Sequence, residues 1–236
     1  MSQSITQSRP GQPAGERPSA AGRAVAGLVV GALFAGGVVP TPVYDLYRAE
    51  YGLSELSLTL LYAVYAVGNL AALLFFARLG DQRGRRPIVL ASLALTAIAA
   101  ALFAVAASPA WLFAARMLSG FAIGLGVGAA TAWTAEFTPK ARRDDASDRV
   151  TLANFVGLAV APLAAALLVQ YWPWPMRTPY LAYLGVLALV ALAAARTPET
   201  LSEPRPASLR PRLGVPRGAR LRFVAPAATQ FAAMAV

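Results

Sequence analysis

Long apolar segments constrain this chain of 236 residues more than any other feature. A helix rises about 1.5 Å per residue, so roughly 20 apolar residues cross about 30 Å of hydrocarbon. Six segments approach or exceed that length: 24–44, 56–77, 87–107, 110–135, 150–171 and 178–195. Hydrophobic residues make up 57% of the chain and charged residues 14%, against about 25% charged in soluble domains. We predict an all-α integral membrane protein, a bundle of six transmembrane helices, and exclude a soluble globular enzyme.

The residue types that are missing exclude several kinds of chemistry. The chain has no cysteine and no histidine, so it offers no disulfide, thiolate nucleophile, Cys/His metal site or imidazole base. A membrane-embedded enzyme would need clustered carboxylates, and the candidate cluster is Asp144, Asp145 and Asp148. Arginines are interleaved with these aspartates, as in a solvated loop. We expect no metal, no cofactor and no enzymatic activity.

The positions of the basic residues predict the topology. Most of the 21 Lys and Arg residues lie in the N-terminal tail, in the loops after the second and fourth spans, and after the sixth span. These segments share one side of the membrane if six helices alternate in direction. The positive-inside rule makes that side cytoplasmic. We predict a multi-pass protein of the cell (inner) membrane with a cytoplasmic N-terminus. A nucleic-acid partner is not expected, because the charge follows the topology.

Changes in composition divide the chain into four parts. Residues 1–23 are polar and predict a disordered cytoplasmic tail, and residues 24–196 hold the six helices. Residues 197–222 are rich in proline and arginine, which is typical of a cytoplasmic linker. Residues 223–236 are apolar again but too short to cross a bilayer, so we interpret them as the start of a truncated seventh transmembrane helix.

The loop between the second and third spans carries a distinctive pattern, because residues 77–87 read ARLGDQRGRRP. Gly84 permits a tight turn, and Asp81 can cap the incoming helix end while it pairs with an arginine. Glu136, at the end of the fourth span, can pair with an arginine of the same turn. An ordinary arginine-rich loop would explain the arginines but not the spacing of Asp81 and Gly84. The pattern favours a conformational latch.

At these positions the chain resembles the major facilitator superfamily, whose members carry G-x-x-x-D-[RK]-x-G-[RK]-[RK] in this loop. The first glycine and the first basic residue are replaced here, by Ala77 and Gln82. The segments 136–143 (E-x-x-P-x-x-x-R) and 198–200 (PET) resemble two further landmarks of the family. The resemblance implies a latch composed of Asp81, Gly84, Arg85, Arg86, Glu136 and Arg143.

Arg116 is the only charged residue within the six spans. A charge in lipid is costly and usually faces a cavity or a partner, although its long side chain can instead reach the outer interface. The family has an arginine here in the pattern L-x-x-x-R-x-x-x-G, which implies a role in proton coupling or substrate binding. Three uncharged polar residues can line the same path or make interhelical hydrogen bonds: Asn69, Asn154 and Thr131.

Small residues predict where helices pack closely. Gly120, Gly124 and Gly128 recur at four-residue spacing, as in small-x-x-x-small packing faces. In the fifth span, Gly157 and Pro162 lie in a segment that resembles the G-x-x-x-G-P-x-x-G-G element of the drug:proton antiporter branch, with alanine at three glycine positions. This favours a kinked, closely packed helix and inclines the interpretation towards export. Alanine is abundant, so a chance match explains the segment equally well.

The resemblance implies the N-terminal half of a twelve-helix transporter that works by alternating access. Proton-coupled efflux of a small organic solute is the favoured reaction, and proton-coupled uptake of a sugar, amino acid or organic acid is the alternative. A non-transporting membrane scaffold or assembly subunit is the alternative of another class. The expected partners are the lipid bilayer, a small-molecule substrate, protons and a missing C-terminal six-helix half. Without that half, we expect no transport by this chain alone.

Overall fold

The computed structural model describes residues 19–139 and 143–201, and within them it is helical and contains no strand. The sequence-based assignments to residues 1–18 and 202–236 lie outside the described residues. Within these ranges, a short 3₁₀ turn at Thr41–Val43 accompanies eight α-helices: α1 (Ala20–Val38), α2 (Tyr44–Tyr51), α3 (Glu55–Phe76), α4 (Leu79–Arg83), α5 (Arg85–Ala104), α6 (Pro109–Glu136), α7 (Arg143–Tyr171) and α8 (Thr178–Arg196). Six stretches of the described part of the chain are long and apolar enough to span a membrane, which confirms the predicted six-helix fold.

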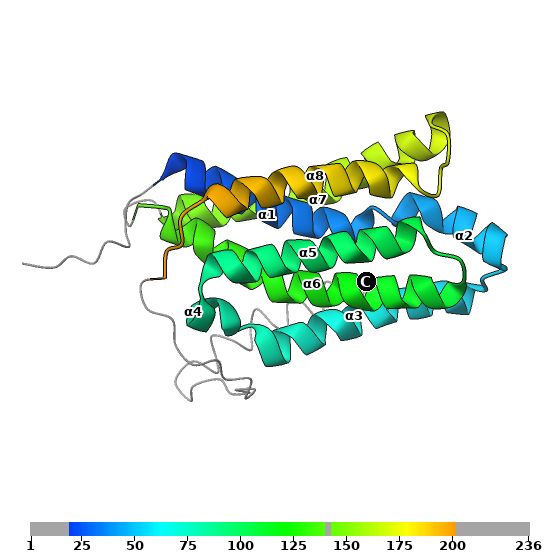
Figure 1. The fold of residues 1–236 in the computed structure, drawn as a ribbon, viewed down its shortest axis with the longest axis horizontal. Coiled ribbons are helices and arrows are strands. Elements are labelled where there is room, and N and C mark those ends of the chain that lie inside the picture. The colour runs from blue at the N-terminus through cyan, green and yellow to red at the C-terminus, as the bar shows by residue number, and fades with distance from the viewer. Residues whose placement is uncertain (1–18, 140–142, 202–236) are drawn as a thin grey trace, which may run out of the picture.

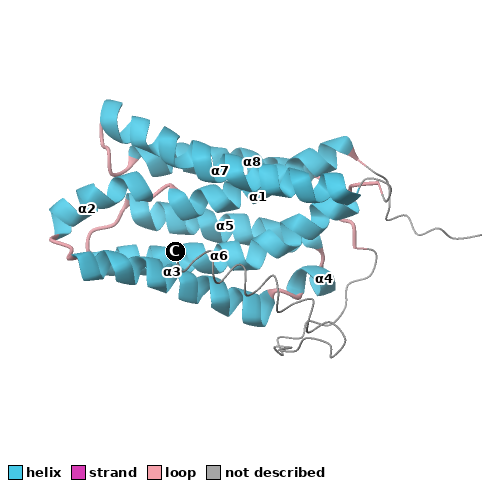
Figure 2. Cartoon of the chain, turned by 180° about the vertical axis from the view of Figure 1, so that it is seen from behind, coloured by secondary structure: helices cyan, strands magenta, loops and turns pink. Residues whose placement is uncertain are grey.

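The six long helices lie side by side in two layers along the long axis of the bundle (Figure 1). One layer holds α1, α7 and α8, and the other holds α3, α5 and α6. The contacts of α1 with α6 and of α5 with α8 join the layers. Figure 2 shows the same arrangement from behind, with α2 and α4 at opposite ends. We call the end that carries α4 the arginine-rich end, after its residues: Arg23, Arg78, Arg83, Arg85, Arg86, Arg149 and Arg196.

The first span differs from its predicted bounds at both ends. It begins at Ala20, because the Ser19 hydroxyl accepts a hydrogen bond from Gly22 N at 3.1 Å and caps the helix. The prediction of a disordered tail is therefore wrong for residues 20–23. The helix ends at Val38 rather than at residue 44, because Pro40 has no N–H with which to continue it. The 3₁₀ turn and α2 follow instead.

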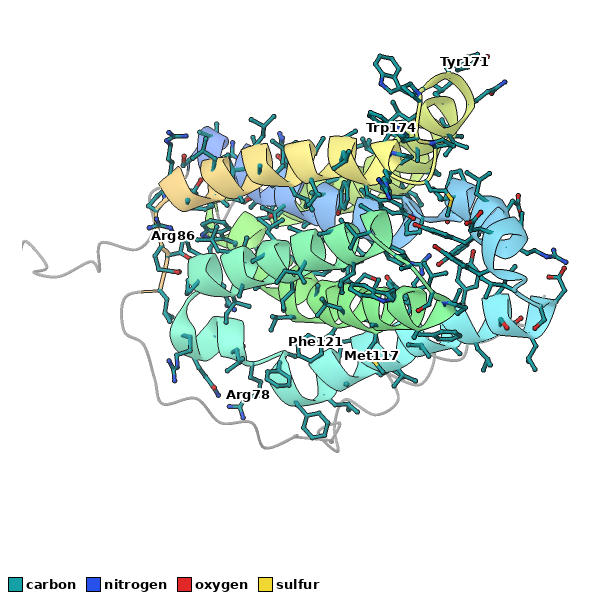
Figure 3. The ribbon with its side chains drawn as sticks, turned by 45° about the vertical axis from the view of Figure 1, so that its right-hand side comes forward. Arg78, Arg86, Met117, Phe121, Tyr171 and Trp174 are labelled. Atoms are coloured by element: carbon teal, nitrogen blue, oxygen red, sulfur yellow. The ribbon has the colours of Figure 1, made fainter. Side chains whose placement is uncertain are left out.

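Glycines on α6 allow α3 and α6 to approach closely. A Cβ added to Gly120 would lie 2.0 Å from the Tyr65 carbonyl oxygen, and one on Gly124 would lie 2.6 Å from the Asn69 carbonyl oxygen. Figure 3 shows Met117 and Phe121 of α6 facing α3 at the same crossing. Close backbone approach strengthens van der Waals packing, which drives helix association where lipid removes the hydrophobic effect.

Gly128 does not extend this packing face. It is exposed, and a Cβ added there would meet no described atom within 4 Å. The prediction of helix packing at Gly128 is therefore wrong for the described bundle, because the space beside this glycine is open. Gly126 is buried instead, where a Cβ would lie 2.0 Å from Ser92 Oγ of α5.

The crossing of α1 with α7 also depends on glycine. A Cβ on Gly157 would lie 2.3 Å from the carbonyl oxygen of Gly31, so the two backbones nearly touch. Pro162 lies one turn further along, and α7 continues through it to Tyr171. The helix also begins earlier than predicted, at Arg143 instead of residue 150.

Candidate functional site

Arg85, the first residue of α5, lies at the centre of a charged cluster at the arginine-rich end. Its Nη1 is 2.5 Å from Asp81 Oδ1, and its Nε donates to Glu136 Oε1 at 3.0 Å. The Arg85 side chain is only 13% exposed, whereas that of Asp81 is 62% exposed. Hydrogen bonds between charged partners are stronger than neutral ones. The guanidinium therefore connects α4 with the end of α6.

Glu199, which follows α8, caps the start of α5. Its two carboxylate oxygens accept hydrogen bonds from Arg85 N at 3.0 Å and Arg86 N at 2.9 Å. These are two of the N–H groups that a helix start leaves without partners, and the helix dipole favours a negative charge there. Glu199 Oε1 also accepts from the backbone N–H groups of Thr200 and Leu201. One carboxylate thus fixes the segment after α8 against α5.

Gly84 is required between α4 and α5 for two independent reasons. Its φ of 112° lies in the region that disfavours side chains, and a Cβ would lie 2.5 Å from Glu199 Oε2. Any other residue would therefore strain the turn and displace the cap.

Two further hydrogen bonds lie at this end of the bundle. The Thr200 hydroxyl donates to Glu136 Oε2, and the Arg86 guanidinium donates to the carbonyl of Ala195 in the last turn of α8. Figure 3 shows Arg86 beside that end of α8. We define the Arg85 cluster by its five side chains: Asp81, Arg85, Glu136, Glu199 and Thr200. It joins the ends of α4, α5, α6 and α8.

The cluster differs from the sequence-based interpretation in two respects. Asp81 pairs with Arg85 but caps no helix, because α4 and α5 have no capping side chain at their N-cap positions and Glu199 occupies the start of α5. The predicted linker 197–222 begins as an ordered segment that holds Glu199 and Thr200 in place. The side chain of Arg143 lies outside what the structure describes.

Arg116 lies inside the bundle, surrounded by aromatic rings. It is 1% exposed, and its Nε donates to the Tyr44 hydroxyl, while its Nη1 donates to the Gly37 carbonyl at 2.8 Å. That carbonyl is free to accept because it is among the last four of α1. Four aromatic rings lie 5.0–5.7 Å from the guanidinium carbon, within cation–π range: Tyr44, Tyr62, Tyr65 and Phe103.

This environment excludes the alternative in which Arg116 extends to the outer interface. Its partners are interior groups, and Nη2 is buried without a hydrogen-bond partner among the described residues. Tyrosine suits a membrane interface as well as a protein interior, and Tyr44 and Tyr47 lie in the interior here. Tyr44 is 4% exposed and Tyr47 is 1% exposed, and the Tyr47 hydroxyl donates to the Phe103 carbonyl at 2.8 Å. The i, i+3 spacing of Tyr62 and Tyr65 was the available signal for this cluster.

The structure does not gather the other polar candidates around Arg116. Asn69 is half-buried against α6, where its Oδ1 would lie 2.6 Å from a Cβ on Gly124. Thr131 is exposed. The Oδ1 atom of Asn154, on α7, is buried without a hydrogen-bond partner among the described residues.

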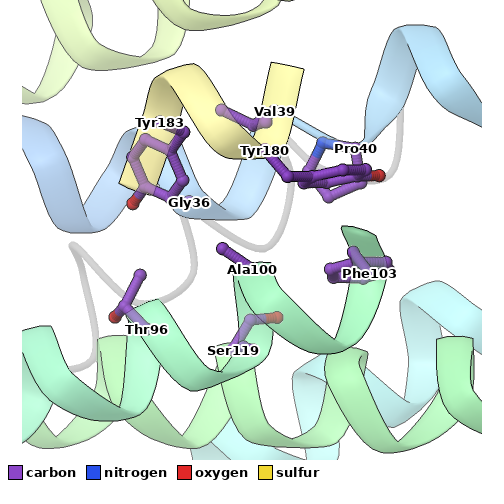
Figure 4. A pocket seen from close by; sticks show the side chains of 10 residues that line it. Gly36, Val39, Pro40, Thr96, Ala100, Phe103, Ser119, Tyr180 and Tyr183 are labelled. Carbon is purple, nitrogen blue, oxygen red and sulfur yellow. The ribbon is translucent and has the colours of Figure 1, made fainter. Parts of the chain in front are cut away.

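A small cavity lies between the two layers, behind Phe103 (Figure 4). Its volume is about 10 Å³, which is close to the space of one water molecule. Its lining includes Tyr180, whose ring stacks on Phe103 with centroids 5.3 Å apart, and Tyr183, whose hydroxyl donates to the Ala32 carbonyl. A cavity of this size cannot hold an organic solute.

Known proteins resemble this chain along most of its length. The family model of the Major Facilitator Superfamily matches residues 24–236. Multidrug resistance protein MdtL of Escherichia coli O81 (strain ED1a) is 28% identical over 142 residues, which cover 60% of this chain and 36% of that protein. MdtL of Escherichia coli O45:K1 (strain S88 / ExPEC) is 28% identical over 163 residues, covering 66% and 42% respectively. The chain thus spans 36–42% of the length of these relatives. Given the extent of the family match, this multi-pass membrane protein belongs to the major facilitator superfamily.

Proposed function

We propose that this chain is the N-terminal six-helix half of a transporter that exports a small organic solute by alternating access. Family membership supports transport, and the multidrug resistance relatives favour efflux over uptake. The observation that carries the mechanism is the Arg85 cluster, which joins four helix ends through one guanidinium and three carboxylates. A C-terminal six-helix half would supply the other wall of the solute path.

The Arg85 cluster acts as a latch in this proposal. The arginine-rich end faces the cytoplasm, following the positive-inside rule. Arg85 and Glu199 hold α5 against α6 and the segment after α8, so these ends move as one unit. The exposed carboxylate of Asp81 pairs with Arg85 through one oxygen and is accessible to a helix of the second half. Docking and release of that helix would close and open the cytoplasmic side.

Arg116 serves as the recognition group of the solute path. Its guanidinium is permanently charged, and its Nη2, which is buried here, would donate to an acceptor oxygen on a solute or on the second half once alternating access opens the bundle at Arg116. The sequence holds no acidic residue between Asp81 and Glu136 or between Arg149 and Arg196. A proton-coupling carboxylate near the middle of the membrane would therefore come from the second half.

The test is transport by the full reading frame that contains this chain, reconstituted in proteoliposomes with an imposed pH gradient. Ethidium is a suitable probe for a multidrug exporter, because its fluorescence reports accumulation. We expect gradient-dependent ethidium movement that Arg116→Ala abolishes, and no movement with residues 1–236 alone. Movement that needs no gradient would refute proton coupling, and flux by residues 1–236 alone would refute the half-transporter assignment.

The same assay separates the alternatives. Uptake would move solute in the direction opposite to that of efflux, and a sugar, amino acid or organic acid would replace ethidium as the substrate. A scaffold needs no latch, so Asp81→Asn and Arg85→Gln would leave its assembly activity intact. In a transporter, both substitutions should reduce flux, whereas neutralising the exposed Arg78, outside the cluster, should not.

A further inference from the structure

An apolar groove runs along the membrane-spanning part of the layer formed by α1, α7 and α8. Its volume is about 720 Å³, within the range of roughly 300–1,000 Å³ seen for ligand pockets. Small residues of α1 form its floor, including Gly27, where an added Cβ would meet no described atom within 4 Å. Val156 and Val160 of α7 form one wall, and Val186 of α8 forms the other. The groove exists because α7 and α8 both pack on α1 and contact each other less than either contacts α1.

The groove has the length and polarity of a lipid acyl chain. Twelve residues of α1 separate Arg23 from Ala35, both of which line it, and a helix of that length rises about 18 Å. One leaflet of a bilayer contributes about 15 Å of hydrocarbon. The three wall valines are half exposed or more, although they lie within spans. An apolar molecule aligned with the helices would cover them.

Two arginines at one end of the groove determine which apolar molecule fits best. Arg23 and Arg149 both line it at the arginine-rich end, where the headgroups of one leaflet would lie. Arg23 donates through Nη1 to the Phe137 carbonyl at 3.1 Å, and its side chain makes no other hydrogen bond to the described residues. Arg149 is exposed and takes part in none of the ion pairs among the described residues. Asp145 and Asp148 precede it on α7 and do not line the groove.

We propose that this groove binds one anionic phospholipid, with an acyl chain between α7 and α8 and the phosphate between Arg23 and Arg149. An apolar helix or a second copy of the chain would cover the same valines. Neither occupant would require two cations at the headgroup level, whereas an anionic lipid satisfies both. Binding of this lipid depends neither on the Arg85 cluster nor on solute transport, so it stands or falls independently of the proposed function.

The test compares lipid retention by the purified chain in native mass spectrometry, with dioleoylphosphatidylglycerol or dioleoylphosphatidylcholine added to the detergent. One arginine near an anionic surface contributes about 1 kcal/mol, equivalent to about five-fold in affinity. We expect one phosphatidylglycerol to be retained preferentially, with Arg149→Gln reducing that preference about five-fold and Arg23→Gln acting similarly. Arg78→Gln is the matched control, because Figure 3 places Arg78 near α3 and α4, away from α8.

A second variant tests the groove itself without removing charge. Gly27→Phe projects into open space, so it should fill the groove and displace the lipid while the helices stay folded. Glycerol phosphate, which has the headgroup but no acyl chain, should not compete. Equal retention of both lipids, an equal effect of Arg78→Gln, or unchanged retention in Gly27→Phe would overturn the proposal. So would disulfide-linked dimers of Val156→Cys in membranes, since a second copy would then occupy the groove.

Discussion

Removing the carboxylate of Glu199 tests the structural basis of the latch. Glu199→Ala leaves the N–H groups of Arg85 and Arg86 without their acceptor at the start of α5, and it frees the segment after α8. Loss of a capping side chain costs about 0.5–2 kcal/mol, and loss of a negative charge at a helix start costs about 0.3–1 kcal/mol. We therefore expect the free energy of unfolding to fall by about 2 kcal/mol.

The assay is unfolding of the chain by sodium dodecyl sulfate in mixed micelles, followed by circular dichroism. Glu199→Gln keeps an acceptor oxygen but no charge, so it should lose roughly half as much as Glu199→Ala. Glu55→Ala is the matched control, because Glu55 also begins a helix but forms an exposed ion pair with Arg48. The side chain of Glu55 is 75% exposed and that of Arg48 is 45% exposed. Exposed pairs contribute less than about 1 kcal/mol. A loss at Glu199 no larger than the loss at Glu55 would refute the capping argument.

Three other substitutions give further predictions. Gly120→Ala should lower the free energy of unfolding by about 1–3 kcal/mol, because its Cβ would collide with the Tyr65 carbonyl. Gly128→Ala is the control and should not lower it. Equal losses for the two variants in micelle unfolding would contradict the packing model. Arg116→Ala, which leaves the Tyr44 hydroxyl without its hydrogen-bond donor, should abolish ethidium flux by the full reading frame. Unchanged flux would exclude a role of Arg116 in solute recognition. Arg85→Gln should reduce flux at least ten-fold in the same assay, and wild-type flux would contradict the latch.

The bilayer explains why hydropathy located the six spans. Backbone groups in hydrocarbon must pair within the segment, so a long apolar run has little choice but to form a helix. The ends of the helices were harder to predict, because capping residues and helix-breaking residues determine them. Ser19 starts α1 four residues before the apolar run, and Pro40 ends it six residues before residue 44. Both are effects of a single residue on the backbone, and the apolar character of the surrounding segment does not reveal them.

The Arg85 cluster could be predicted only where its members are close in sequence or share a recognised motif. Asp81 and Arg85 are four residues apart, on either side of the Gly84 turn, and Glu136 belongs to a motif of its own. The capping role of Glu199 links residues 114 positions apart, a distance at which spacing carries no information. Likewise, the residue type does not place Tyr44, because a tyrosine suits both a membrane interface and the surroundings of a buried arginine.

The most direct test of the central claim is the side of the membrane on which the Arg85 cluster lies. The chain has no cysteine, so single cysteines can be introduced at the exposed positions Arg83, beside the cluster, and Ser54, at the opposite end. Intact cells are then treated with a membrane-impermeant maleimide. We predict that Ser54→Cys is labelled and that Arg83→Cys is labelled only after permeabilisation. Labelling of Arg83→Cys in intact cells, with Ser54→Cys protected, would place the cluster outside the cell and contradict the account.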